Sequence, residues 1–332
     1  MQQGFWNVGI RKRMKATLRA SAAVAAVALG CTAAPLTGYA VRIEPAAQEG
    51  VTSNIFGSAG SESEFYRQIS QTITQGQESL TITLDQPVSD QEEFIELGRQ
   101  AVYQARRDYP ESFLGNHTEF VYYYNESGYY QVTCSFRYLD LTGEQKQAMF
   151  NEVDSIVAQA RAQTGGDTVG MLRYFQQALC ERAEYDFAAA RSDSDHYPNA
   201  YHAYGALMEG KSVCPGYAYA FTLLCDRAQD PCWIVTGTYG DEPHAWNYVW
   251  VNNNYYLVDV TWDDANNRPA DSAFFLAGRD HAANYHVEDN CAPGTLAARS
   301  YSETGTTVIR RARQQTNQEE SSSRTLAGAA KG

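Results

Sequence analysis

Cys214 stands in the stretch GKSVCPGYAYAF, residues 210–221, between a glycine-led turn and an aromatic-rich segment. Proline is favoured in the first turn of a helix because its missing N–H has no partner there, so Pro215 predicts that a helix begins at or next to Cys214. The free N–H groups and the dipole at that end of a helix stabilise a thiolate over a thiol. Cys214 is therefore a candidate nucleophile, with a small buried residue at a helix start as the alternative.

A histidine and an aspartate follow Cys214 in the sequence and could serve as its base and as the group that orients that base. A thiolate nucleophile needs an imidazole, which a third polar group orients. His244 opens the strand-like run HAWNYVWV, and Asp259 lies in the next run, YYLVDVTW. An aspartate inside so apolar a run is costly to bury without a partner. We expect His244 to act as general base and acid and Asp259 to orient it, with a structural histidine as the alternative.

The turn between these two runs decides whether the pair can meet. If Asn252 and Asn253 form a two-residue type I′ turn, Trp246 lies opposite Asp259 on the neighbouring strand. Strand side chains alternate between faces, so His244, Trp246 and Asp259 then share one face. His244 and Asp259 become diagonal neighbours, whereas a three-residue turn would place them on opposite faces.

Four further side chains are expected near this site. Tyr217, Trp246 and Trp262 are candidates for the wall of a substrate pocket, with core packing as the alternative for each. Asn247 is expected to support the site rather than react.

The sequence gives no support for a metal or a cofactor. Asp263, Asp264 and Asp271 do not have the spacing of a calcium loop, and a solvated acidic turn is the better interpretation. The chain contains no C-x-x-C pair for zinc and no glycine-rich phosphate loop. We expect no metal and no cofactor.

The order of the periodic segments predicts an α+β fold, in which helices are packed on an antiparallel sheet. Ser89, Thr142 and Asp167 are the predicted N-caps of three helices. Helices are expected over 61–73, 90–107, 143–164, 168–185 and after Cys214, and strands over 79–84, 119–124, 129–139, 232–239, 244–251 and 255–262.

The chain divides into five expected parts. These are a signal peptide at 1–40, a linker at 41–60, an N-terminal α+β extension at 61–145, a catalytic domain at 146–300 and a disordered tail at 301–332. Basic residues at 11–15 precede the apolar run SAAVAAVALG, which is too short to span a bilayer comfortably. Cleavage after residue 40 is expected, with a lipoprotein anchored through Cys31 as the alternative.

The charge of the chain restricts its partners. The formal net charge is −13, and residues 1–40 hold five basic and no acidic residues, so cleavage there would change the charge from −13 to −18. A surface with so large a negative charge repels phosphate groups and anionic lipids. We therefore expect a secreted or extracytoplasmic protein with a protein or peptide substrate, no nucleic-acid partner and no membrane insertion after signal removal. Association with the cell wall or cell surface is a further option.

Three stretches, AYGALMEGKSVCPGYAYAF, CWIVTGTYGDEPHAWNYVWVNNNYYLVDVTWDD and FFLAG, resemble the transglutaminase-like superfamily. The resemblance covers about residues 165–290. It implies a papain-like core, with Cys214 as nucleophile, His244 as general base and acid, and Asp259 as orienting acid. The upstream unit resembles the extension of secreted bacterial members. Many members have an acidic or other polar residue where this chain has Pro215, which could alter substrate contacts.

Together these observations predict an exported thiol enzyme that acts on amide bonds of proteins or peptides through a thioester. Hydrolysis by a protease or amidase is the first expectation, because water is always available as acceptor. Cross-linking of protein glutamine side chains to amines is the enzymatic alternative. A non-catalytic cell-surface binding module is the alternative from a different class.

Overall fold

The computed structural model describes residues 62–192, 194–265, 273–288 and 291–302, together with the backbones of strands β1 (Ala26–Val27), β2 (Gly38–Pro45) and β3 (Asn54–Phe56). Apart from these strands and residues 301–302, the predicted signal peptide (1–40), linker (41–60) and tail (301–332) lie outside the described residues. Within the described ranges, no helix combines the length and apolar character that a membrane crossing requires.

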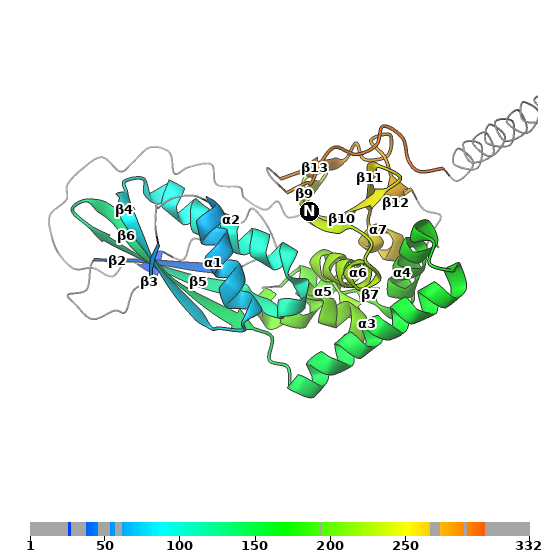
Figure 1. Ribbon diagram of the computed structural model, residues 1–332, viewed down its shortest axis with the longest axis horizontal. Helices are drawn as coiled ribbons and strands as arrows, with labels where there is room; N and C mark the ends of the chain where they lie inside the picture. Colours follow the sequence, from blue (N-terminus) through cyan, green and yellow to red (C-terminus); the bar gives the residue numbers. More distant parts are fainter. Residues whose placement is uncertain are drawn as a thin grey trace, which may run out of the picture.

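The first lobe is a sheet with two helices on one face (Figure 1). The strand order is β1-β2-β5-β6-β4-β3, and the elements are α1 (Glu62–Thr74), β4 (Ser79–Val88), α2 (Gln91–Asp108), β5 (Leu114–Asn125) and β6 (Gly128–Tyr138). Alternate strand residues such as Phe120 and Val132 are fully buried and pack with Phe65 and Phe94 of the helices. The predicted N-cap Ser89 is wrong by one residue, because the Asp90 carboxylate accepts the first N–H groups of α2.

The second lobe begins with an antiparallel helix pair, α3 (Gly143–Thr164) and α4 (Thr168–Arg182). Thr142 and Gln145 form the predicted capping box at the start of α3, and the Asp167 side chain caps α4 as predicted. Both predictions rest on side chains that satisfy N–H groups which the helix itself leaves unpaired. The two helices are thus fixed at their starts by local sequence.

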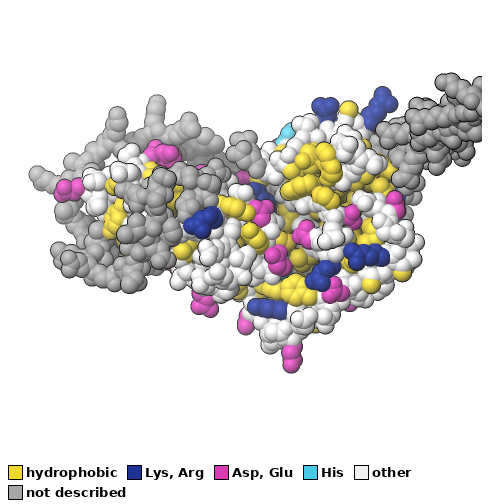
Figure 2. Space-filling model, in the orientation of Figure 1, with side chains coloured by type: hydrophobic (Ala, Val, Ile, Leu, Met, Phe, Trp, Pro, Cys, Tyr) yellow, Lys and Arg dark blue, Asp and Glu magenta, His cyan; other side chains and the backbone are white. Residues whose placement is uncertain are grey.

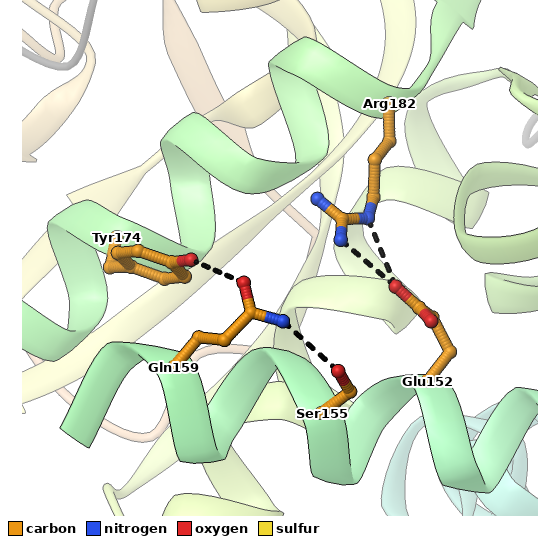
Figure 3. Close-up of polar contacts among 5 residues, drawn as sticks. All are labelled: Glu152, Ser155, Gln159, Tyr174 and Arg182. Carbon is orange, nitrogen blue, oxygen red and sulfur yellow. Dashed lines mark hydrogen bonds and ion pairs between the residues drawn. The ribbon is translucent and has the colours of Figure 1, made fainter. Parts of the chain in front are cut away.

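Polar contacts join α3 to α4 along their exposed sides (Figure 3). Arg182 donates to Glu152 Oε1 at 2.9 Å and 3.3 Å. The Tyr174 hydroxyl donates to Gln159 Oε1 at 3.1 Å, and the Gln159 amide donates to Ser155 Oγ at 3.0 Å. Because these groups are partly exposed, the contacts add little to stability.

Helix α6 packs on a second, fully antiparallel sheet (Figure 1). The strand order is β12-β11-β10-β9-β13, comprising β9 (Cys232–Tyr239), β10 (Glu242–Val251), β11 (Asn254–Val258), β12 (Phe275–Ala277) and β13 (Tyr285–Val287). The remaining elements are β7 (Glu184–Tyr185), α5 (Phe187–Ala190), β8 (Lys211–Ser212), α6 (Cys214–Ala228) and α7 (Val260–Ala265). Short 3-10 or π-helical turns occupy Pro110–Ser112, Ser194–His196, Pro198–Tyr201 and Gly205–Glu209. The order of helices before an antiparallel sheet confirms the predicted α+β class.

The hairpin of β10 and β11 has the predicted two-residue turn. Asn252 and Asn253 both have positive φ, 49° and 63°, as a type I′ turn requires. The pairing places Asn247 opposite Val258, which is the predicted register. The predicted strand over 255–262 is wrong at its end, because β11 stops at Val258 and α7 follows. The Asp259 carboxylate accepts the Trp262 N–H at 3.3 Å and so favours a helix start over a longer strand.

Charged side chains on the face seen in Figure 2 are of both signs and lie interspersed around the second lobe. On that face the basic residues do not gather into one continuous patch.

Candidate active site

Cys214 is the first residue of α6, preceded by Val213 at the N-cap and followed by Pro215 in the first turn. Its side chain is 6% exposed, and it is a free cysteine. The preceding loop is tied down, because the Asp186 N–H donates to the Ser212 carbonyl at 2.8 Å where β7 and β8 pair. The start of the helix is therefore held rigidly against β7.

Gly216 allows α6 to approach the loop before it closely. A Cβ at Gly216 would lie 2.2 Å from Ser212 Oγ, 2.5 Å from the Ala200 carbonyl oxygen and 2.9 Å from the His202 carbonyl oxygen. Such distances are far inside van der Waals contact, so only glycine fits without moving the backbone. The position of Cys214 depends on this close packing.

His244 and Asp259 form a buried pair at the end of the β10–β11 hairpin. His244 Nε2 lies 2.6 Å from Asp259 Oδ2, and the two side chains are 7% and 0% exposed. The Tyr285 hydroxyl donates to the same Asp259 oxygen at 2.8 Å. A buried carboxylate needs such donors to offset its desolvation.

Tyr285 was not among the residues expected from the sequence. It belongs to β13, which pairs with β9 and brings Tyr285 opposite Tyr239. The polar segment around Tyr285 carries no local pattern that points to Asp259. Only the pairing of β13 with β9, from segments far apart in the chain, reveals this partner.

The charge state of His244 is controlled by opposing effects. Burial alone would lower its pKa, but the charges of Asp259 and Cys214 and hydrogen bonds to both side chains raise the pKa from 6.5 to about 10. Since Nε2 contacts Asp259, the other ring nitrogen, Nδ1, is the one available to the thiol. The arrangement therefore favours the charged form of the His244 ring.

A second buried histidine shows the opposite behaviour. Burial, together with the charge of Arg106, lowers the pKa of His202 to about 4. Its Nε2 contacts the Pro110 carbonyl oxygen at 3.0 Å, and its ring stacks at 5.3 Å on Phe113. His202 therefore has the contacts of a neutral packing residue, and proximity to an acid is what distinguishes His244.

The expected pocket residues take different positions. Trp262 lines the cavity next to Cys214. Tyr217 and Trp246 are each 1% exposed and do not line it. Tyr217 donates to Asp264 at 2.6 Å, and Trp246 stacks on His244 with ring centroids 5.9 Å apart.

Asn247 lies on the opposite face of β10, toward α6. Its amide donates to the Ala218 carbonyl oxygen at 3.1 Å and to Thr222 Oγ1 at 2.9 Å. These bonds join the strand that carries His244 to the helix that carries Cys214. Asn247 thus fixes one element relative to the other.

A cavity of about 590 Å³ opens beside the reactive groups. Its lining includes Cys214 and His244, and most of the other lining groups are apolar or aromatic. They are Tyr185, Phe187, Ala190, Arg191, Tyr201, Val213, Tyr239, Glu242, Pro243, Thr261 and Trp262. A concave, mainly apolar cavity with a few reactive polar groups is typical of an enzyme site. Among the described residues, no cluster of three or more His, Cys, Asp or Glu side chains could hold a metal ion.

Comparison with known proteins places these residues in a recognised family. The model of the transglutaminase-like superfamily matches residues 155–260. Over 96 residues the chain is 32% identical to the kyphoscoliosis peptidase of Homo sapiens and 31% identical to that of Mus musculus. Each match covers 25% of this chain and 14% of the relative, so the chain corresponds to a small part of those proteins.

Two solved structures are also similar. One is a crystal structure described as a TGase, with a TM-score of 0.32, 17% identity, and coverage of 55% of this chain and 51% of that one. The other is the periplasmic domain of TgpA from Pseudomonas aeruginosa, with a TM-score of 0.28, 15% identity, and coverage of 42% and 59%. The family model spans the segment that carries Cys214, His244 and Asp259. Residues 155–260 of this chain therefore match the transglutaminase-like superfamily.

Proposed function

We propose that this protein is a thiol-dependent amide hydrolase that cleaves peptide or protein substrates. The observation that carries the proposal is the His244–Asp259 pair, 2.6 Å apart and buried, beside Cys214 at the start of α6. Its location in a cavity of about 590 Å³ gives a substrate access to the thiol. The name "peptidase" of the relatives that match this segment agrees with amide-bond chemistry.

The proposed reaction begins with proton transfer from Cys214 to His244. The thiolate attacks the carbonyl carbon of the amide, and the C–N bond then breaks to leave a thioester on Cys214. His244, now an imidazolium, gives its proton to the departing amine. Asp259 holds the ring so that Nε2 faces the carboxylate throughout, which keeps Nδ1 directed at the reacting atoms.

The start of α6 supplies a place for the negative oxygen of the tetrahedral intermediate. The first N–H groups of a helix have no partner within the helix, and Pro215 has no N–H. The N–H groups of Cys214 and Gly216 are therefore the available donors in this turn. We also assign the Tyr185 hydroxyl, from the lining of the same cavity, as a third donor to the oxyanion.

Water then attacks the thioester, and His244 removes a proton from that water to release the acid product and the free thiol. An amine in place of water would give transamidation through the same thioester. Among the described lining residues the one carboxylate is that of Glu242, which is exposed. Hydrolysis is the preferred outcome, because water is always available as the acceptor.

The first test follows alkylation of Cys214 against pH, with the modified residue identified by mass spectrometry. An activated thiolate should react rapidly well below the usual thiol pKa of about 8.5, and His244→Ala should remove this reactivity. Slow labelling with an ordinary thiol profile would instead favour a binding module.

The second test distinguishes the reactions. Fluorogenic peptides should be cleaved by the protein and not by Cys214→Ala. Incorporation of a labelled amine that depends on Cys214, with no cleavage, would establish cross-linking instead.

We further propose that the protein acts outside the cytoplasm, on the basis of the basic and apolar segments within residues 1–40.

A further inference from the structure

One wall of the cavity carries a large apolar side chain that the fold does not bury. Phe187 is 60% exposed, more than any other large hydrophobic side chain in the described part of the chain. It belongs to the short helix α5 and lines the cavity together with Tyr185. The two rings contact edge to face at 4.9 Å. Exposed aromatic side chains beside a reactive cavity are positioned to contact a ligand.

The charged groups of the cavity lie at its edge. Among the described lining residues, apart from Cys214 and His244, the charged ones are Arg191 and Glu242, and both are exposed. The Arg191 guanidinium lies over the Phe187 ring at 5.8 Å. Among the described lining residues, a charged substrate side chain would therefore find no buried group of opposite charge apart from the reacting pair.

The inner surface is formed by apolar and aromatic groups from four separate segments. Tyr201 and Val213 are buried, at 4% and 1% exposure, and form the floor near Cys214. Tyr239 and Trp262 contact each other with ring centroids 4.7 Å apart and form another wall. An apolar side chain that enters this space would remove apolar surface from water on both partners.

We propose that this cavity selects a large uncharged side chain, aromatic or branched aliphatic, on the acyl side of the scissile amide, and that Phe187 is a residue that determines this specificity. The inference rests on the proposed amide hydrolysis, because the acyl half of the substrate is the part bound to Cys214 in the thioester. The acyl-side residues must then lie along the cavity that holds the thiol. Phe187 covers the substrate side chain from the solvent side.

The test uses quenched fluorescent peptides that differ at one acyl-side position, with Phe, Leu, Ala, Glu or Lys at each of three positions in turn. At one of these positions, kcat/KM for Phe and Leu should exceed that for Glu and Lys by about tenfold or more. The variant Phe187→Ala should reduce the ratio of Phe to Ala peptides toward one. Tyr124→Ala removes another exposed aromatic ring, 41% exposed and located in β5, and should leave the ratio unchanged.

The possible results distinguish failure of the specificity inference from failure of the proposed hydrolysis. Cleavage at equal rates for Phe and Glu peptides, or a Phe187→Ala variant that keeps the full preference, would overturn the specificity inference and leave hydrolysis intact. If no peptide is cleaved, the hydrolase proposal fails. Binding of the same labelled peptides to Cys214→Ala, measured by fluorescence anisotropy, then tests the cavity alone. A Kd about tenfold lower for Phe than for Glu peptides supports the inference, and equal Kd values overturn it.

Discussion

Replacing Asp259 by asparagine separates the charge of this side chain from its hydrogen bonds. The asparagine has the same shape and can still accept a hydrogen bond from His244 Nε2, which lies 2.6 Å from the carboxylate in the native protein. It carries no charge, so the largest effect that raises the pKa of His244 against burial disappears. Burial itself remains, because Asp259 is 0% exposed and the substitution opens no path to solvent.

The structure sets the size of the effect. The charges of Asp259 and Cys214 hold the pKa of His244 at about 10 against an ordinary value of 6.5, while burial acts in the other direction. Each pKa unit corresponds to about 1.4 kcal/mol, so the native environment stabilises the imidazolium by roughly 5 kcal/mol. In Asp259→Asn we expect the pKa of His244 to fall, because burial then acts against Cys214 alone. The thiolate loses its cationic partner, and its alkylation near neutral pH should slow at least tenfold.

The assay is the second-order rate of iodoacetamide labelling at Cys214 from acid to alkaline pH. Asp264→Asn is the matched control, since it neutralises a nearby carboxylate that bonds Tyr217 rather than His244. Asp259→Ala removes both charge and hydrogen bond. A native profile in Asp259→Asn together with slow labelling in Asp259→Ala would refute the charge argument. It would show that Asp259 acts by orientation alone.

Three further outcomes follow from the same contacts. Tyr285→Phe removes the hydroxyl that donates to Asp259 at 2.8 Å, so urea denaturation should show a loss of about 1.5–3 kcal/mol, and unchanged stability would contradict this role. Gly216→Ala should cost about 1–3 kcal/mol and slow hydrolysis, whereas Gly143→Ala, where a Cβ meets nothing within 4 Å, should be tolerated; equal effects would contradict the packing argument. The folded pKa of His244 lies above its ordinary value, so its stabilisation is complete below about pH 6.5 and is lost as pH rises toward 10. The unfolding free energy of the native protein should therefore decline over that range more steeply than that of His244→Gln, and parallel declines would show that His244 contributes nothing.

Turn and cap chemistry made the local parts of this structure predictable. Asn252 and Asn253 adopt positive φ readily, so their turn and its register follow from the two residues themselves. Thr142 and Asp167 cap their helices by bonds to N–H groups within three residues. The same reasoning placed a helix at Cys214, because Pro215 and the glycine-led turn act on adjacent backbone.

The end of β11 shows where a local pattern was insufficient. The run YYLVDVTW has strand-like residues throughout, yet the chain turns into α7 after Val258. Asp259 bonds forward to the Trp262 N–H, and its own N–H bonds to the Phe274 carbonyl at 2.9 Å. The second bond comes from β12's side of the sheet, which no pattern within the run can reveal.

By itself, the sequence determined the longer helices, most of the longer strands of the described chain, the register of one hairpin and the chemical types of Cys214, His244 and Asp259. Tertiary structure alone decided which side chains surround them. Trp246 is buried behind His244, while Phe187 and Tyr239, from segments far apart in the chain, form the cavity wall. The physical reason is that turns and caps depend on bonds between near neighbours, whereas a cavity is defined by the packing of surfaces whose separation in sequence carries no local signal.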